Sequence, residues 1–568
     1  MRFQSFLIVT ALLSASLPLS HAQSINPPVA AGRITGTVVH SVTGQPLAGI
    51  EVAISPTEQR DLRTEVTTGS DGRFVFENLA RGKFTLSAQG RGFSEQAYQQ
   101  HAPFSTAVAV GPDVISENLV FELVPDASIS GTVLDEENEV VRSGDVMLFA
   151  RNGATGRMES RAQANLEEQG RYHFGHLSPG VYFLAVSAQP WYATDPPISR
   201  NAAQLYTEGE AQTYKDALPV AESSENSALD LTYRITFYAD AVEGESATPI
   251  QLHPGERASA DITLRAVPAV HLTVRNITTD PNQPASAQVQ QKVFNRTLLP
   301  ILARSQPGAH GTLRLSGIPP GHLILKFRSF TGKEWKTQVR EVDISGDSEI
   351  DAADNSSFPV SIHGRVQIPG QAAFAPGFYI RFYNRDTNES FGGPVSPKGE
   401  FEISQSITGS PEYEVAVINA RGSIVQKITA IGAKVVGRTL LLPRSGTVDL
   451  TVTLSEQAAR IDGTVLRNGK GTSQAMVVLV PESLPGNADL IRRDQSDSDG
   501  TFSLYQVLPG RYRVVALANG WDLDWQNPAI LRPYLEYSEP IEVTSARTYR
   551  ISVPVQNSTV SQPANPQN

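Results

Sequence analysis

Short runs of alternating apolar and polar residues recur along the chain, and one double run appears four times. In its first copy Phe74 and Phe76 share one face, and Phe84, Leu86 and Ala88 share one face of the second run. Side chains two residues apart lie on the same side of a β-strand, so the pattern predicts antiparallel strands with one buried face. The matching residues of the other copies are Tyr172, Phe174, Leu177, Tyr182, Leu184 and Val186; Leu313, Leu315, Ile318, Leu323, Leu325 and Phe327; and Phe502, Leu504, Val507, Tyr512, Val514 and Ala516.

A second phrase, Ile-x-Gly-x-Val, precedes each double run. A glycine opens each run, and the two glycines are 10 residues apart: at 72 and 82, 170 and 180, 311 and 321, and 500 and 510. The opening phrase occurs at 34–38, 129–133, 362–366 and 461–465, with a degenerate copy at 270–274. Because repeated units indicate structural modules, the sequence predicts five. Their limits are 23–124, 125–267 with a C-terminal extension, 268–357 for the degenerate module, 358–455 and 456–555.

The fourth module departs from the pattern. Gly399, Phe401 and Ile403 fit, but Ser406 stands where leucine is expected and the next run, from Tyr413, starts late. This predicts a longer turn within the same fold. Helix signals are scarce, apart from residues 527–534, where Asn527 can cap a short helix. The chain is therefore predicted to be all-β, with short strands and Gly/Pro turns.

The two ends of the chain differ from the modules. Residues 1–22 resemble a secretory signal, with Arg2, an apolar core from 6 to 17, and small residues before Gln23. The alternative, an N-terminal membrane anchor, needs a longer apolar run of about 18–20 residues. No later run is long enough to cross a membrane. We therefore expect export to the periplasm or the cell exterior, and a disordered tail at 556–568.

Composition narrows the possible chemistry. The chain has no cysteine, which excludes disulfides, thiolate metal sites, a cysteine nucleophile and a lipoprotein anchor. Its formal net charge is −11, and removal of Arg2 with the signal makes it one unit more negative. This balance argues against nucleic acid and anionic membrane surfaces as partners. Apolar cores alone must hold the modules together.

The repeated phrases resemble the carboxypeptidase regulatory-like domain, a transthyretin-like (prealbumin-like) β-sandwich found in some metallocarboxypeptidases and in tandem in bacterial exported proteins. The resemblance implies a tandem array of about five antiparallel Greek-key sandwiches, and it says little about function. Related sandwiches include starch-binding-like modules and adhesin repeats, some with a lysine–asparagine isopeptide bond. The first strands here contain no lysine, so that bond is not expected. The matching residues are Gly36-Thr37-Val38, Gly44 to Val52, Ser70 to Phe74 and Leu79 to Leu86.

Three clusters resemble metal sites, and each has a simpler interpretation. His253 and Glu256 have the His-x-x-Glu spacing of a zinc pair, but Pro254-Gly255 between them indicates a turn. His173 and His176 flank a predicted strand end, where exposed pairs are common. Residues 496–500 resemble a fragment of a calcium loop but fit a hairpin turn better. No nucleophile elbow or phosphate loop occurs. We therefore predict no catalytic residues, no metal and no cofactor.

Five aromatic residues follow the last core strands of modules two and five: Trp191, Tyr192, Trp521, Trp525 and Tyr534. Flat aromatic rings can stack on sugar rings, and the polar residues Asp522, Asp524, Gln526 and Asn527 could bind hydroxyl groups. The alternative, which we favour, is that these rings plug the end of a sandwich or seal a joint between modules. They are the candidate ligand-binding residues.

These observations favour a non-catalytic binding or scaffolding protein of the cell envelope, with carbohydrate as the preferred ligand class. One alternative is a purely structural spacer or protein–protein assembly module that uses exposed strand edges. Another is an accessory region of an exopeptidase. Proline-containing linkers at 124–126 and 267–269 predict semi-stiff connections, so we expect the modules to form a curved or extended rod.

Overall fold

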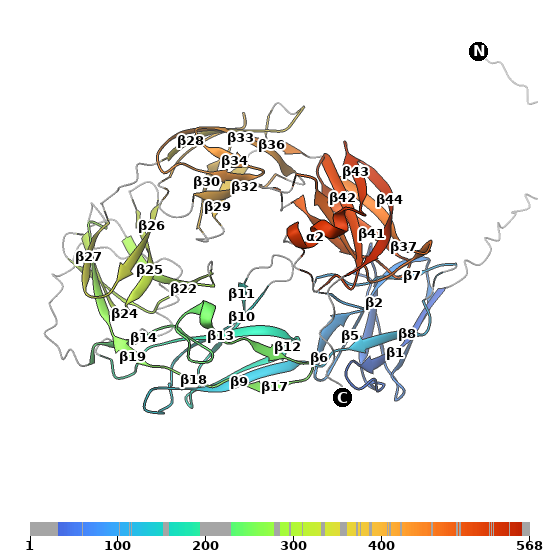
Figure 1. The fold of residues 1–568 in the computed structure, drawn as a ribbon, viewed down its shortest axis with the longest axis horizontal. Coiled ribbons are helices and arrows are strands. Elements are labelled where there is room, and N and C mark those ends of the chain that lie inside the picture. Colours follow the sequence, from blue (N-terminus) through green and yellow to red (C-terminus); the bar gives the residue numbers. More distant parts are fainter. Residues whose placement is uncertain are drawn as a thin grey trace, which may run out of the picture.

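The structure is a computed structural model, and it confirms an all-β chain of tandem sandwiches (Figure 1). In the described part of the chain, five apolar cores follow one another, within 34–123, 127–264, 270–352, 360–454 and 459–553. The described residues are 32–558 without 60, 102, 113, 115, 152–157, 194–228, 278–284, 295–296, 309–310, 331–334, 353–359, 371–372, 375–376, 385–388, 406, 408–410, 421–422, 456–457, 484–486, 488–489, 522, 524, 526–527 and 545. The predicted signal peptide lies outside them.

The first module consists of two sheets packed face to face. Its strands are β1 (Gly32–His40), β2 (Glu51–Pro56), β3 (Thr64–Thr67), β4 (Arg73–Leu79), β5 (Gly82–Gly90), β6 (Phe93–Ala97), β7 (Val108–Val110) and β8 (Leu119–Leu123). One sheet has the order β4-β1-β8, and the other has β3-β2-β5-β6 with β7 also on β5. The opening strand β1 pairs antiparallel with β4 and parallel with β8, so the module begins and ends on neighbouring strands.

The second module repeats this plan and adds a C-terminal extension. Its sheets have the orders β12-β9-β17, with β18 on β9, and β11-β10-β13-β15, with β16 on β13; β14 and β19 form a separate pair. A 3-10 turn, η2 (Gly244–Ser246), belongs to the extension. The strands are β9 (Ala127–Leu134), β10 (Gly144–Arg151), β11 (Met158–Asn165), β12 (Arg171–Leu177), β13 (Gly180–Ala188), β14 (Leu231–Tyr233), β15 (Thr236–Phe237), β16 (Ile250–Leu252), β17 (Arg257–Ser259), β18 (Ile262–Thr263) and β19 (Ala266–Pro268).

The third and fourth modules are also two-sheet sandwiches. The third has the orders β23-β24-β20-β27 and β22-β21-β25-β26, and the fourth has β31-β28-β36-β33 and β30-β29-β32-β35-β34. Ser406 of the fourth module lies outside the described residues. The strands of the third are β20 (Val270–Arg275), β21 (Ala285–Val293), β22 (Thr297–Pro300), β23 (Arg304–Gly308), β24 (Thr312–Ile318), β25 (Gly321–Phe330), β26 (Trp335–Ile344) and β27 (Ser348–Asp351). Those of the fourth are β28 (Val360–Gln367), β29 (Tyr379–Asn384), β30 (Glu389–Pro394), β31 (Glu400–Gln405), β32 (Glu412–Ile418), β33 (Ile424–Ile431), β34 (Lys434–Val436), β35 (Thr439–Leu441) and β36 (Gly446–Ser455).

The fifth module joins its two layers through its last strand. β44 pairs parallel with β37 along its first part and parallel with β42 near its end, which links eight strands into one sheet. The strands are β37 (Ala459–Arg467), β38 (Lys470–Gly471), β39 (Met476–Pro481), β40 (Arg492–Gln495), β41 (Thr501–Val507), β42 (Gly510–Ala518), β43 (Glu539–Val543) and β44 (Thr548–Asn557). The helix α2 (Pro528–Leu535) occupies almost the predicted range, and β44 extends two residues into the predicted tail.

The recurrent Ile-x-Gly-x-Val phrase has a packing reason. Gly36 lies directly across the sheet from Phe74, Gly364 from Phe401, and Gly463 from Phe502. In each pair the aromatic ring covers the glycine, and a Cβ added to Gly364 would lie 2.0 Å from the ring of Phe401. The third module has leucine at both places, with Leu272 opposite Leu315. The residue pair across the two strands is therefore matched in size: glycine leaves room for an aromatic ring, and leucine lies opposite leucine.

The array closes into a ring, because the fifth module lies against the first (Figure 1). We name this contact the closing joint: its first-module side is Lys83 with residues 99–101 and 103–109, and its fifth-module side is residues 493–501 with Trp521 and Trp525. The expectation of an open rod was therefore wrong. The sequence gives local periods but no sign of a contact between segments about 400 residues apart.

Contacts at the other joints orient the modules. Between modules one and two, Asp126 accepts hydrogen bonds from the backbone N–H and the hydroxyl of Ser94, at 2.9 and 3.0 Å, and lies 2.7 Å from Nδ1 of His176. Between modules two and three, Phe294 packs against Phe149 and Phe237 in a shared apolar cluster. These contacts hold the proline-containing connections in one arrangement.

The glycine–aromatic pairs can be tested in the fourth module. Gly364→Ala should destabilise this module by about 1 to 3 kcal/mol, because the new methyl group overlaps the ring of Phe401. Hydrogen exchange of β28 and β31 measures the effect locally. Gly346→Ala is the matched control, because a Cβ there meets nothing within 4 Å. Equal protection in the two variants would contradict the packing explanation.

Candidate functional site

The closing joint is built around a turn of the fifth module that fits against the first module. Residues 496–500, considered above as a calcium-loop fragment, form this turn between β40 and β41. Its backbone closes through Asp497 N to Thr501 O at 2.8 Å and Gly500 N to Asp497 O at 2.8 Å. The Asp499 carboxylate accepts hydrogen bonds from the Thr501 backbone N–H and hydroxyl. The hairpin interpretation accounts for these residues.

Backbone and side-chain hydrogen bonds connect this turn to the segment before and within β7. The backbone N–H of Ser498 donates to Ala107 O at 3.0 Å. In return, the Ala107 N–H donates to the Asp497 carboxylate at 2.9 Å and the Ala109 N–H donates to the Ser498 hydroxyl at 2.8 Å. The two segments therefore align side by side like strand partners, and fifth-module side chains accept two of these three hydrogen bonds.

Polar side chains are completely buried at the centre of the joint. Thr106, Gln495 and Ser496 are 1%, 1% and 0% exposed. The Gln495 amide nitrogen donates to the Gln99 carbonyl at 2.7 Å and to the Thr106 hydroxyl at 2.8 Å, and its oxygen lies 3.0 Å from Nδ1 of His101. Buried polar groups are tolerated when they are hydrogen-bonded, and the partners of Gln495 come from the opposite module.

Charged groups surround this centre. The Lys83 ammonium group contacts the Asp497 carboxylate and the Thr501 hydroxyl, and lies 3.6 Å from the Asp499 carboxylate. Burial raises the pKa of Asp497, while the Lys83 charge and hydrogen bonds oppose that shift. Burial also raises the pKa of Asp494 to about 6, and the charge of Asp497 adds to the effect. The joint therefore contains more carboxylate than its single ammonium group balances.

Aromatic rings close the other side of the joint. Trp521 stacks on His101 with ring centroids 4.8 Å apart and planes 8° apart, and it also contacts Phe104. The Arg493 guanidinium lies 3.9 Å from the ring centre of Trp525 and 5.1 Å from that of Phe104. Burial lowers the pKa of Arg493 to about 10, which leaves it charged at neutral pH. Stacked rings and a cation–π contact are typical of the strongest parts of protein interfaces.

The structure separates the five aromatic residues considered for ligand binding into two groups. Trp521, Trp525 and Tyr534 lie together with α2 on the fifth module, where Tyr534 is buried and the Trp521 indole N–H donates to Gln474 O at 3.1 Å. Trp191 and Tyr192 lie on the second module. Ligand binding by these residues stays a prediction, and the polar residues 522, 524, 526 and 527 lie outside the described residues.

In the second group, Trp191 and Tyr192, the indole ring of Trp191 is exposed to solvent. Trp191 is 69% exposed and meets Tyr192 edge to face, with centroids 5.7 Å apart. The Tyr192 hydroxyl donates to the Glu136 carboxylate at 3.2 Å, which fixes the tyrosine beneath the indole. A flat exposed ring on a fixed support is a suitable platform for stacking.

The histidine and carboxylate groups considered above as metal ligands make structural contacts within the fold. The Glu256 carboxylate accepts a hydrogen bond from the His253 backbone N–H at 2.7 Å, which closes the predicted turn. His176 is paired with Asp126, and within the described residues no group of three His, Asp or Glu side chains could hold a metal ion.

A search of the helices in the same part of the chain finds none that is long and apolar enough to cross a membrane.

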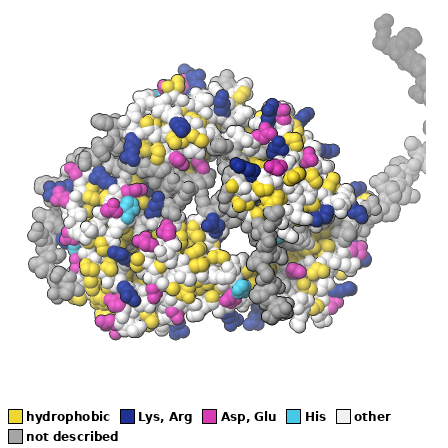
Figure 2. Space-filling model, in the orientation of Figure 1, with side chains coloured by type: hydrophobic (Ala, Val, Ile, Leu, Met, Phe, Trp, Pro, Cys, Tyr) yellow, Lys and Arg dark blue, Asp and Glu magenta, His cyan; other side chains and the backbone are white. Residues whose placement is uncertain are grey.

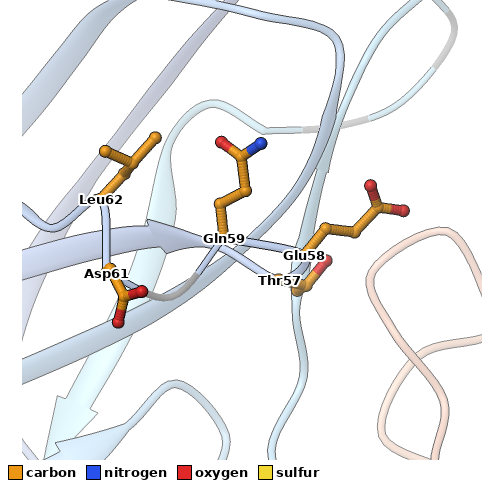
Figure 3. A pocket seen from close by; sticks show the side chains of 5 residues that line it. All are labelled: Thr57, Glu58, Gln59, Asp61 and Leu62. Atoms are coloured by element: carbon orange, nitrogen blue, oxygen red, sulfur yellow. The ribbon is translucent and has the colours of Figure 1, made fainter.

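An open hollow lies on the loop after β2, lined by Thr57, Glu58, Gln59, Asp61 and Leu62. Its side chains point away from one another, and Leu62 is 59% exposed (Figure 3). Such a lining cannot hold a ligand from several sides. Over the visible face of the molecule, acidic and basic side chains are interspersed (Figure 2). Neither feature competes with the closing joint as a candidate site.

Sequence reasoning identified the fifth-module side of the joint and missed the first-module side. Trp521 and Trp525 were selected as unusual, whereas His101, Phe104 and Thr106 drew no attention. The sequence carries no signal of this contact, because Gln495 and Ser496 belong to a run from 492 to 499 that is polar throughout and has the pattern of an exposed strand and turn.

The pKa of Asp494 predicts how stability depends on pH. Its folded-state pKa of about 6 exceeds its ordinary value of 3.8, so the folded chain holds a proton that the unfolded chain has released. Stability should therefore fall as pH rises from about 4 to 6. Asp494→Asn removes this titration but leaves one acceptor oxygen for the N–H groups of Gln495 and Ser503, so the readout is the pH dependence. We expect the loss of stability of β40 and β41 between pH 5 and pH 7, about 1 to 2 kcal/mol in the native chain, to shrink in this variant. Hydrogen exchange at pH 5 and pH 7 measures this.

Asp71→Asn, at an exposed turn of the first module, is the matched control and should change neither value. A residual pH dependence from Asp497 is expected in the Asp494→Asn chain. An equal loss of stability between pH 5 and pH 7 in the Asp494→Asn chain and the native chain would show that Asp494 does not titrate in this range.

Comparisons with known proteins address the fold. Solved structures similar to the chain include the Bacillus anthracis TIE protein, at 9% identity over 92% of this chain and 74% of that one, with a TM-score of 0.17. Another is GBS52, the minor pilin of Streptococcus agalactiae, at 12% identity over 41% and 97%, with a TM-score of 0.20. The shaft pilin SpaA of Lactobacillus rhamnosus GG has 9% identity over 42% and 98%, with a TM-score of 0.19. At such low TM-scores these likenesses say nothing about function.

The family comparison is more specific. A search of curated proteins gives no match. Residues 33–114, within the first predicted module, match the model of the carboxypeptidase regulatory-like domain. This range covers both sheets of the first sandwich from β1 to β7. Residues 33–114 are therefore similar to the carboxypeptidase regulatory-like domain, and they begin a tandem array of β-sandwich modules.

Proposed function

We propose that the chain is an exported, non-catalytic scaffold of the cell envelope that works as a closed ring of β-sandwich modules. The closing joint is the observation that carries this proposal. Its buried centre, Thr106 with Gln495 and Ser496, is hydrogen-bonded across the two end modules, which supports a defined ring. A closed ring presents module faces at fixed positions, which is what a scaffold for other envelope proteins requires.

Export and the absence of catalysis belong to the same proposal. The signal-like residues 1–22 support export to the periplasm or the cell exterior. The use of Glu256 to close a turn and of His176 to pair with Asp126 supports structural roles for these groups. A scaffold also explains why the repeated modules differ mainly in their loops and extensions. An accessory role beside an exopeptidase is the less favoured reading.

A cysteine pair tests ring closure and export together. Ala109 and Ser498 are 389 residues apart in sequence, yet the backbone N–H of one donates to the hydroxyl of the other at 2.8 Å. In the cysteine-free chain, Ala109→Cys with Ser498→Cys should form a disulfide within one chain wherever the compartment is oxidising. We expect a faster-migrating species on non-reducing gels when residues 2–22 are present in a bacterial host, and none when they are deleted.

The purified double-cysteine chain, oxidised in solution, serves as the control for closure alone. Val42→Cys with Ser498→Cys places one cysteine away from the joint and should give no fast species. A reduced pair in the purified, oxidised chain would contradict the ring. A disulfide in solution without one in cells that carry the full chain would contradict export alone.

Carbohydrate binding is a second candidate function, favoured by the exposure of Trp191. Its indole is 69% exposed and supported by Tyr192, whereas the ring of Trp521 is already stacked on His101. In the closed ring, a sugar could therefore stack on the second module without disturbing the joint. The polysaccharides of the envelope are the ligand class that suits such a platform.

A glycan screen of the purified chain separates the two aromatic groups. If the second module binds sugar, Trp191→Ala should weaken binding at least tenfold, because stacking on one ring contributes much of the affinity at a shallow site. Trp525→Ala is the comparison, because its ring faces Arg493 within the joint. Binding that Trp191→Ala leaves unchanged would remove this residue from consideration. Binding lost only in Trp525→Ala would place the ligand on the fifth module.

A further inference from the structure

The joints of the ring differ in chemistry, and this difference indicates which one can separate. Between modules two and three, Phe294 lies among Phe149, Phe183 and Phe237, with centroid distances of 5.4 Å to each. Val293 and Leu299 of the third module are buried in the same cluster. Separation here would expose a continuous apolar patch, which soluble proteins rarely tolerate. This joint is therefore permanent.

The closing joint has the composition of a contact that can form and break. Its fully buried centre is polar, with Thr106, Gln495 and Ser496, and Lys83 pairs with Asp497 at the margin. Its other side consists of the rings of His101, Phe104 and Trp521. Water can replace the hydrogen bonds when the modules move apart, and the rings exposed at the same time are groups that a second copy would cover. Domain contacts of this polar kind resemble transient protein–protein interfaces.

The two sides of the closing joint are different surfaces, and every copy of the chain carries both. Residues 99–101 and 103–109 offer His101 and Phe104, and the fifth module offers Trp521 and Arg493 to receive them. A contact between two different surfaces is heterologous, so it can be satisfied within one chain or between neighbouring copies. Each module has its own core, so an exchange would leave the sandwiches intact.

We propose that the closing joint is also a head-to-tail self-assembly surface, through which the fifth module of one chain binds the first module of a second copy. This inference rests on the closed ring of the proposed function. Within one chain the effective concentration of the two ends is high, on the order of millimolar for tethered partners. Isolated chains therefore close on themselves, and crowded chains exchange ends into rings of two or into longer arrays.

Charge complementarity gives a direct test with full-length mature chains. Lys83→Glu places like charges opposite Asp497 and Asp499, and Asp497→Lys places a second lysine opposite Lys83. Each variant alone should open and remain a monomer of larger hydrodynamic radius. In an equal mixture the new glutamate meets the new lysine at one joint, and native Lys83 meets native Asp497 at the other. We expect a species of twice the single-chain mass in light scattering, formed only on mixing.

The matched control reverses a surface pair outside the joint. Arg33→Glu mixed with Glu117→Lys alters an exposed pair of the first module and should give monomers alone and together. A mixture of the two joint variants that stays at the mass of one chain, although both variants are folded and expanded, would overturn the proposal. A dimer that also forms in the control mixture would overturn it too.

Single cysteines provide a second measurement if the charge variants remain compact. Chains with Ala109→Cys and chains with Ser498→Cys, unfolded together, refolded and oxidised, should form a mixed disulfide dimer at least several times more abundant than the dimers of either chain alone. No excess of the mixed dimer would refute exchange between copies. A joint that forms within a chain but never between chains leaves the ring scaffold standing and removes only this inference.

Discussion

Burial of apolar side chains between the two sheets holds each module together, because the chain has no cysteine to form disulfides. Two sheets must therefore approach closely and leave no gap. The opening strand achieves this by pairing with the next core strand on one side and with the closing strand of its module on the other. Glycine lies opposite an aromatic residue in four modules, at Gly36, Gly131, Gly364 and Gly463, and two leucines occupy these places in the third module.

Because each module completes its own core, the shape of the array depends on the joints between modules. Asp126 ties the first connection by accepting hydrogen bonds from Ser94 and pairing with His176. An apolar cluster around Phe294 fixes the second. The closing joint uses buried hydrogen bonds and a cation–π contact, which favour a specific alignment more than a large gain in stability. The ring therefore combines joints of different chemistry, and under the proposed exchange between copies the closing joint is the one that opens.

The sequence predicted the modules well because their signals are local. Alternation around Phe74 and Phe76, the glycine spacing and the turn dipeptides all act within one hairpin, so strands and the short helix could be placed from the residues alone. The closing joint has no local signal, since Thr106 and Gln495 meet only after five modules have folded and been oriented. Trp521 and Trp525 were recognisable as unusual, but an aromatic loop has the same pattern whether it faces a sugar or another module. Only the arrangement of the whole array distinguishes the two.

Under the proposed function, scaffolding and ligand binding at Trp521 would be linked. The face of Trp521 that could stack on a sugar is covered by His101 when the joint is closed, so a ligand there must bind the open form better than the closed one. By linkage, such a ligand would favour opening, and closure would weaken its binding by the same factor. A ligand on Trp191, outside the joint, has no such contact to compete with. A ligand bound at Trp521 would therefore change the equilibrium between the open and the closed ring. A ligand bound at Trp191 would only attach the closed ring to the ligand.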